Sequence, residues 1–104
     1  MNVKRRGKGP GGMTIKEAVY QVIKKLEKST GKEIFNQVKM ISSEWGDHAI
    51  LRHIMGLTIN LQPGYYEWVF IKEKEKCLFL CEDGYFEQYN KDKHGIFEDG
   101  VRLE

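Results

Sequence analysis

One short stretch of the chain places a guanidinium and two imidazoles at helical spacing among apolar residues. It reads GDHAILRHIMG over residues 46 to 56 and contains His48, Arg52 and His53. A guanidinium can bind a guanine edge or a phosphate through two parallel hydrogen bonds, and imidazole nitrogens can bond to either. The spacing therefore predicts either a helix that recognises a polyanion or a core helix with a few solvated positions.

The cations of the chain are concentrated in its first half. Residues 1 to 58 carry eleven Lys or Arg against five Asp or Glu, a charge of +6, whereas residues 59 to 104 carry six against ten, a charge of −4. This asymmetry favours a polyanionic partner, although the four cations near the glycine-rich start could simply aid solubility. The further candidate contact residues are Lys32, Lys39, Asn60, Lys74 and the arm residues Lys4, Arg5, Arg6 and Lys8.

Each candidate also has an ordinary structural explanation. Arg52 could pair with Asp47 or Glu44 on the surface, and isolated histidines are more often structural than functional. Asn60 could equally cap the end of a helix. The lysines are also what any solvated helix carries, so both interpretations stay open.

Catalysis and metal binding have little support in the sequence. It contains no Gly-rich phosphate loop, no evident pairing of a nucleophile with a base, and no Asp/Glu/Lys cluster typical of a nuclease. Cys77 and Cys81 would share one face of a strand roughly 13 Å apart, too far for one metal ion or a disulfide. Trp45 could stack on a base but is expected to pack in the core. We therefore expect a protein that is not an enzyme and has no metal or cofactor.

Length and composition indicate one globular domain. The chain has 104 residues, of which 40% are hydrophobic and 31% charged. No apolar run approaches the roughly 20 residues of a membrane span, and the basic start lacks the apolar region of a secretory signal. With only two cysteines at no framework spacing, a reduced, cytoplasmic protein away from membranes is expected.

Two capping boxes predict where the first helices begin. Thr14 is followed by Glu17, and Thr30 by Glu33, each at the spacing that lets the two residues cap one another. Apolar residues then recur at i, i+3 and i+4 after each box. This pattern predicts one helix over about 15 to 28 and a second that ends near the serines at 42 and 43.

Residues 46 to 56 are expected to form the third helix. Asp47 is expected to cap it, with Gly46 loosening its first turn. Its apolar residues would point inward and its polar residues outward. The inward set is Ile50, Leu51, Ile54 and Leu57, and the outward set includes His48, Arg52, His53 and Asn60.

The second half of the chain changes to a period of two. Strands are expected at 65 to 71, 77 to 81 and 85 to 89, with Asp83–Gly84 as a hairpin turn. The turn between the first two strands would form a weak phosphate-binding wing, because two glutamates interrupt its three lysines, Lys72, Lys74 and Lys76. In the polar end, the expected apolar anchors are Ile96, Phe97 and Val101.

Three helices followed by a small antiparallel sheet is the order of an α+β winged helix-turn-helix. In that fold the third helix keeps an outer face that fits the major groove of DNA. We expect a flexible basic arm at 1–12, the winged-helix domain at 13–97 and a C-terminal tail at 98–104.

The segment TIKEAVYQVIKKLEKSTGKEIFNQV, followed by ILRHI and aromatic strands, resembles winged-helix domains of the HARE-HTH kind. It is also similar to small helix-turn-helix modules attached to restriction and modification enzymes. The resemblance covers about residues 13 to 97 and consists of helix starts and core positions. The sequence departs from that of a strong DNA binder because its presumed recognition helix has only one permanent cation, Arg52.

The resemblance implies DNA binding, or the coupling of DNA recognition to a partner enzyme. The sequence thus favours a prokaryotic or phage accessory or regulatory factor that binds double-stranded DNA. The alternative is a protein–protein interaction module that docks on an enzyme or inhibits it through an aromatic, acidic sheet face.

Overall fold

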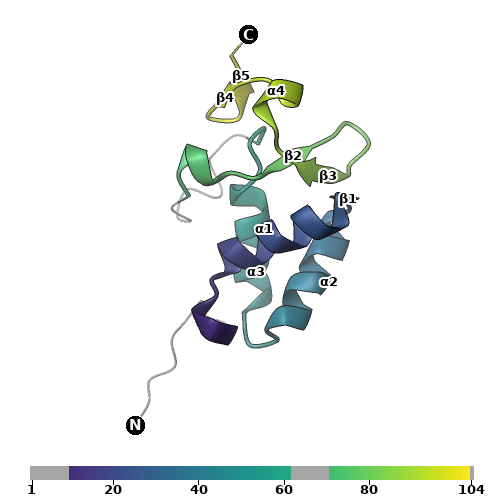
Figure 1. The fold of residues 1–104 in the computed structure, drawn as a ribbon, viewed down its shortest axis with the longest axis vertical. Helices are drawn as coiled ribbons and strands as arrows, with labels where there is room; N and C mark the ends of the chain where they lie inside the picture. The colour runs from purple at the N-terminus through teal and green to yellow at the C-terminus, as the bar shows by residue number, and fades with distance from the viewer. Residues whose placement is uncertain (1–9, 62–70, 104) are drawn as a thin grey trace.

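Three helices come first in the chain, and a small sheet packs against one end of them (Figure 1). The structure, a computed structural model, describes residues 10–61 and 71–103. The predicted contacts Lys4, Arg5, Arg6 and Lys8 and all but the last residue of the strand expected at 65 to 71 lie outside the described residues. The elements are the helices α1 (Ile15–Leu26), α2 (Gly31–Ile41), α3 (Asp47–Gly56) and α4 (Lys91–His94), the 3-10 turns η1 (Pro10–Gly12) and η2 (Glu73–Glu75), and the strands β1 (Lys28–Ser29), β2 (Leu78–Leu80), β3 (Phe86–Gln88), β4 (Phe97–Glu98) and β5 (Val101–Arg102).

Both predicted capping boxes are confirmed. The Thr14 hydroxyl accepts a hydrogen bond from the Glu17 amide at 3.2 Å, and the Glu17 carboxylate accepts one from the Thr14 amide at 3.0 Å. Thr30 and Glu33 repeat this exchange at the start of α2, at 3.1 and 2.9 Å. Each box satisfies two amides that a helix otherwise leaves without partners, which explains why α1 and α2 begin where they do.

The third helix begins differently from the prediction. Gly46 is its N-cap residue and makes no side-chain capping bond, while Asp47 is already the first helical residue. The expectation that Asp47 caps the helix is therefore wrong. Its carboxylate instead pairs with Lys39 from α2 at 3.0 Å.

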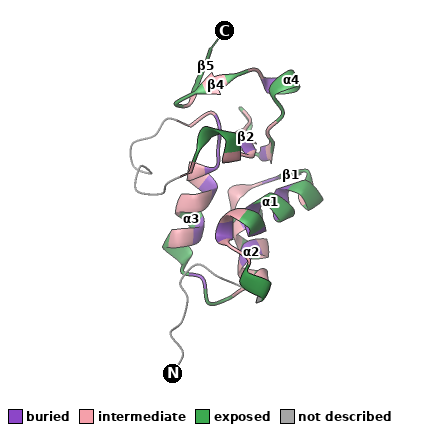
Figure 2. Ribbon diagram, turned by 60° about the vertical axis from the view of Figure 1, so that its left-hand side comes forward, coloured by how far each residue is buried: buried purple, intermediate pink, exposed green. Residues whose placement is uncertain are grey.

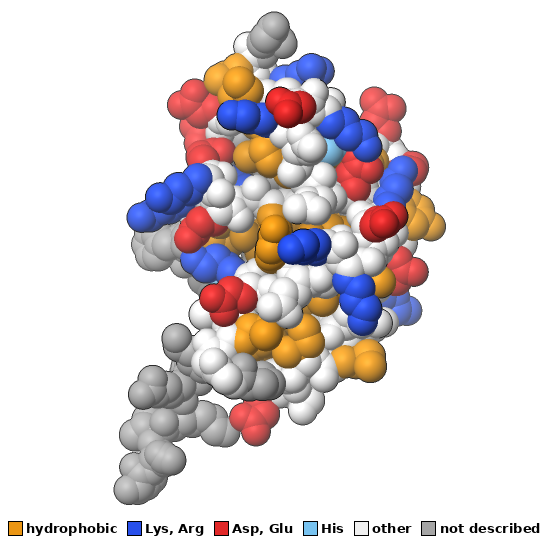
Figure 3. Space-filling model, viewed as in Figure 1, with side chains coloured by type: hydrophobic (Ala, Val, Ile, Leu, Met, Phe, Trp, Pro, Cys, Tyr) orange, Lys and Arg blue, Asp and Glu red, His pale blue; other side chains and the backbone are white. Residues whose placement is uncertain are grey.

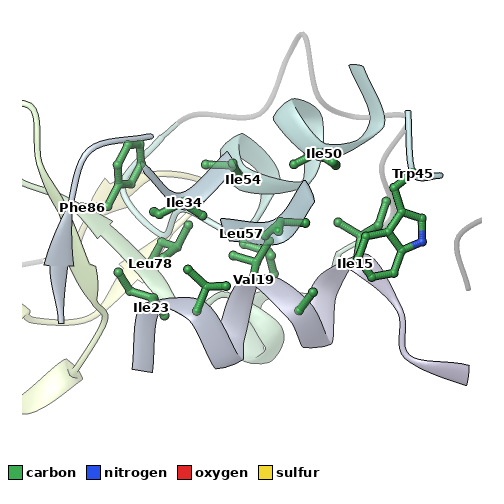
Figure 4. Close-up of a cluster of buried hydrophobic side chains, with 13 residues drawn as sticks. Ile15, Val19, Ile23, Ile34, Trp45, Ile50, Ile54, Leu57, Leu78 and Phe86 are labelled. Atoms are coloured by element: carbon green, nitrogen blue, oxygen red, sulfur yellow. The ribbon is translucent and has the colours of Figure 1, made fainter. Parts of the chain in front are cut away.

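The core lies between the three helices and the sheet. Figure 4 shows it as one cluster, with Trp45 beside Ile15 at one end and Phe86 at the other. Leu51 was expected to point inward, but its side chain is 44% exposed. The reason is helical geometry, because successive residues differ by about 100° around the axis and Ile50 already points into the core. The largest fully buried apolar side chains are Ile23, Ile34, Ile50, Leu57, Leu78, Val19 and Val38.

The first strand of the sheet lies between α1 and α2, where the sequence predicted the end of the first helix near residue 28 and then a short turn. The chain leaves α1 at Glu27, which has a φ of 69°, so the helix ends at Leu26 and not at residue 28. The next two residues, Lys28 and Ser29, pair with β3 as β1. Two residues carry too little pattern for a strand to be recognised, and only β3 makes them one.

The sheet has the antiparallel order β1-β3-β2. On the other edge of β2, the Leu78 amide donates to the carbonyl of Leu57 at 3.0 Å, and the Ile59 amide donates to the carbonyl of Leu78 at 2.8 Å. The chain that leaves α3 is thereby fastened to the sheet. The predicted α+β class, with three helices and a small antiparallel sheet in the winged helix-turn-helix layout, is confirmed.

A small C-terminal unit covers the outer face of the sheet. It consists of α4 and the hairpin β4–β5, whose turn residues Asp99 and Gly100 both have positive φ. Such a two-residue turn matches the twist of the paired strands. Phe97 packs edge-on against Phe79 and Tyr89, whereas the other expected anchors, Ile96 and Val101, are 57% and 49% exposed. The domain boundary expected at residue 97 falls inside β4.

Candidate nucleic-acid interface

The outer face of α3 holds two of the three candidate contact residues of this helix, His48 and Arg52, together with Leu51. His48, Leu51 and Arg52 occupy positions i, i+3 and i+4, on the side opposite Ile50 and Ile54. His48 and Leu51 are exposed and Arg52 is half-buried. Figure 2 shows α3 with buried residues on its inner side and exposed or half-buried ones elsewhere. This face combines hydrogen-bonding groups with apolar contact area, as major-groove recognition requires.

His53 lies on the flank of α3 and is tied to its own helix. Its Nδ1 lies 2.7 Å from the carbonyl oxygen of Ala49. A carbonyl oxygen can only accept, so Nδ1 carries the proton and donates this bond. That leaves Nε2 as the ring nitrogen that could meet a ligand, and as an acceptor when the ring is neutral.

Lys39 faces the turn between α2 and α3. Its ammonium donates to the carbonyls of Ser43 at 3.2 Å and Trp45 at 2.8 Å, and it pairs with Asp47 at 3.0 Å. By contrast, Lys32 in the first turn of α2 is exposed. The two lysines were predicted as equivalent contacts, but they have different surroundings.

Asn60 bridges the edge of β2. Its side-chain amide donates to the carbonyl of Leu80 and its side-chain oxygen accepts from the Leu80 amide, both at 2.9 Å. The Asn60 carboxamide therefore bonds to the backbone of Leu80 as a neighbouring strand would. Asn60 is neither a C-cap of α3, where Leu57 holds that position, nor presented toward a ligand.

The wing of this fold corresponds to the hairpin between β2 and β3. The lysine-rich turn at 72 to 76, predicted as the wing, lies before that hairpin. Lys74 is exposed within η2, before β2 begins. The tip carries Glu82 and Asp83, and Asp83 pairs with Lys28 of β1 at 3.2 Å. Over the face seen in Figure 3, the described basic and acidic side chains are interspersed. The wing is thus acidic at its tip, which does not suit contact with phosphates.

A buried histidine that the sequence prediction missed holds the C-terminal unit in place. The His94 ring stacks on Phe79 with centroids 4.0 Å apart, and its Nδ1 accepts from the Asn90 amide at 3.0 Å. Its Nε2 donates to the Glu87 carboxylate at 2.5 Å. Because both nitrogens are used, His94 is a structural residue and not a general base. Only the capping by Asn90 at the start of α4 has a local signal in the sequence.

Glu87 makes stability depend on pH. The hydrogen bond from His94 holds the pKa of the Glu87 carboxyl below its usual range, partial burial opposes this, and Lys93 at 3.3 Å adds to it. A lowered pKa stabilises the fold above the ordinary value near 4.5, and this contribution is lost as the pH falls through the folded pKa.

We expect Glu87→Gln to remove that contribution while keeping an acceptor for His94. The free energy of unfolding of the wild type should exceed that of the variant at about pH 6, and the difference should shrink toward about pH 3. Urea titrations at a series of pH values measure it. A difference that stays constant over this range would contradict the assignment.

Metal binding and thiol chemistry have no support in the described part of the chain. Among residues 10–61 and 71–103, no three His, Cys, Asp or Glu side chains are grouped so that they could hold a metal ion. Burial raises the pKa of the Cys77 thiol to about 11, which keeps it protonated and a poor nucleophile at neutral pH. None of the helices described is both long and apolar enough to cross a bilayer.

Comparison of the chain with protein-family models, with curated proteins and with solved structures finds no match. The resemblance of residues 13 to 97 to HARE-HTH modules therefore stays a prediction.

Proposed function

We propose that the protein binds double-stranded DNA with the outer face of α3 in the major groove. The observation that carries this proposal is the placement of His48, Leu51 and Arg52 on one side of the third helix of a winged helix-turn-helix layout. A helix fits the width of the major groove, and the opposite side of α3 is used by the core. An accessory or regulatory role for a protein of a prokaryote or a phage, in the cytoplasm and without catalysis, is part of the same proposal.

In this proposal each group has a stated role. Arg52 binds a guanine edge or a phosphate, and His48 bonds to a base edge or a phosphate. Lys32 and the basic arm of residues 1–12 supply phosphate contacts that do not depend on the DNA sequence. Asn60 is withdrawn from the contact residues because Leu80 occupies both of its polar atoms. The acidic wing tip contributes no affinity, so binding is modest, and its salt dependence comes from the phosphate contacts of Lys32 and the basic arm.

Titration of a duplex at several salt concentrations tests the proposal. The logarithm of the affinity should fall linearly with the logarithm of the salt concentration, by about 0.9 for each phosphate contact. Arg52→Ala should weaken binding by roughly 5- to 150-fold if it pairs with a base. Lys91→Ala is the matched control, because it removes an exposed cation from α4 on the far side of the sheet.

Two results would contradict DNA binding through α3. One is the absence of duplex binding at low salt. The other is binding that survives both Arg52→Ala and removal of residues 1–12, since the proposed surface would then contribute nothing.

The second candidate is a protein-interaction module, and the C-terminal hairpin favours it. Ile96, Val101 and Leu103 are each about half exposed, and their pairing places them on one face of the hairpin. This is the face opposite Phe97, so it points away from the sheet. Val101→Asp should leave duplex binding unchanged if DNA binds at α3, whereas it should weaken binding to a protein that docks on the hairpin.

A further inference from the structure

The turn between α2 and α3 sets the direction of α3, yet α3 lacks the device that starts the other two long helices. Gly46 provides no side-chain capping bond, whereas α1 and α2 each have a complete capping box. Another contact must therefore hold the beginning of α3 against the end of α2. Trp45, which is 4% exposed, anchors the turn in the core, but its packing does not provide a donor for the carbonyls of Ser43 and Trp45.

Lys39 supplies this contact from the last turn of α2. A lysine ammonium has three N–H groups, and here three oxygens surround it within 3.2 Å. Two are the carbonyls of Ser43 and Trp45, in the turn, and the third belongs to Asp47, the first residue of α3. One side chain thus connects α2, the turn and α3.

We propose that Lys39 is a positioning residue, which fixes α3 relative to α2 and does not itself contact phosphate. Its ammonium already donates to two carbonyls and pairs with the Asp47 carboxylate, and its side chain is only 29% exposed. A phosphate that bound Lys39 would have to displace these oxygens and would meet the carboxylate of Asp47. The statement about phosphate rests on the proposed DNA binding, whereas the positioning of α3 does not.

Hydrogen exchange tests the positioning without DNA. The Ile50 amide donates to the Gly46 carbonyl in the first turn of α3, so it reports on the beginning of that helix. Lys39→Met should speed its exchange by about tenfold or more, because charge-assisted bonds to the turn are lost. Lys39→Arg, which keeps donors at the same place, should restore slow exchange. Lys32→Met is the matched control and should leave the Ile50 amide unchanged.

The salt dependence of duplex binding tests the second half of the inference. Lys39→Met should lower the affinity at every salt concentration without changing the slope, because no phosphate contact is removed. Lys32→Met should reduce the slope by about 0.9, as expected for one lost phosphate contact.

A reduced slope for Lys39→Met with unchanged exchange at Ile50 would overturn the inference and make Lys39 a phosphate contact. Exchange of the Ile50 amide that is as slow in Lys39→Met as in Lys32→Met would overturn the positioning role. Should the wild-type protein bind no duplex, the proposed function fails, but the exchange result still decides whether Lys39 positions α3.

Discussion

Leu78→Ala is expected to lower the free energy of unfolding by about 2 to 5 kcal/mol. Leu78 is 0% exposed and belongs to the core cluster that joins the sheet to the helices. Its backbone also lies in β2, between Gln88 of β3 and the segment that follows α3. The cavity left by the missing side chain would therefore open between the sheet and the helices. Urea or thermal unfolding measures the loss.

Leu51→Ala is the matched control because it makes the same chemical change on α3. Leu51 is 44% exposed, and leucine and alanine both favour helices, so the change should stay within about 0.5 kcal/mol. A loss at position 51 as large as that at position 78 would mean that Leu51 points into the core, as its sequence pattern first predicted. The outer face of α3 would then have to be assigned again.

His94→Ala is expected to loosen the C-terminal unit by about 2 to 4 kcal/mol. The substitution removes the ring that stacks on Phe79 and the donor that satisfies the buried side of Glu87. It also leaves the Asn90 amide without its acceptor. Hydrogen exchange should become faster throughout α4 and the β4–β5 hairpin before it does so in α1.

His48→Ala is the control for the histidine substitution. His48 is exposed on α3, so its removal should change the free energy of unfolding by less than about 0.5 kcal/mol. We also expect the two variants to differ in function. His48→Ala should weaken duplex binding without affecting the fold, whereas His94→Ala should affect the C-terminal unit and leave α3 intact. The reverse pattern would show that the structural and contact roles have been exchanged.

Helix starts could be predicted because their causes are local. Thr14 and Glu17 satisfy each other within one turn, and so do Thr30 and Glu33, so the residues that cause the helices are visible in the sequence. The turn at Asp83–Gly84 could be predicted for the same reason. Gly84 has a φ of 89°, and the Asp83 carboxylate accepts a hydrogen bond from the Tyr85 amide.

The candidate interface was only partly predictable. The spacing predicted that His48, Arg52 and His53 share one helix. The surroundings of the candidate residues, however, depend on residues distant in the sequence. Lys39 and Lys32 have the same chemistry in the sequence, yet one is held by a turn and the other is exposed. Asn60 is not a C-cap because α3 already ends at Gly56, and its side chain instead bonds to Leu80, twenty residues further on.

By itself, the sequence determined the helix starts that capping controls, the alternation of the β2–β3 hairpin and the order of three helices before that hairpin in an α+β winged helix-turn-helix. Only the tertiary structure decided that Lys28–Ser29 is a strand, that Leu51 faces outward and that His94 is buried against Glu87. The physical reason is the range of the interactions. Caps and turns are satisfied within a few residues, whereas burial and strand pairing depend on partners that only folding brings together.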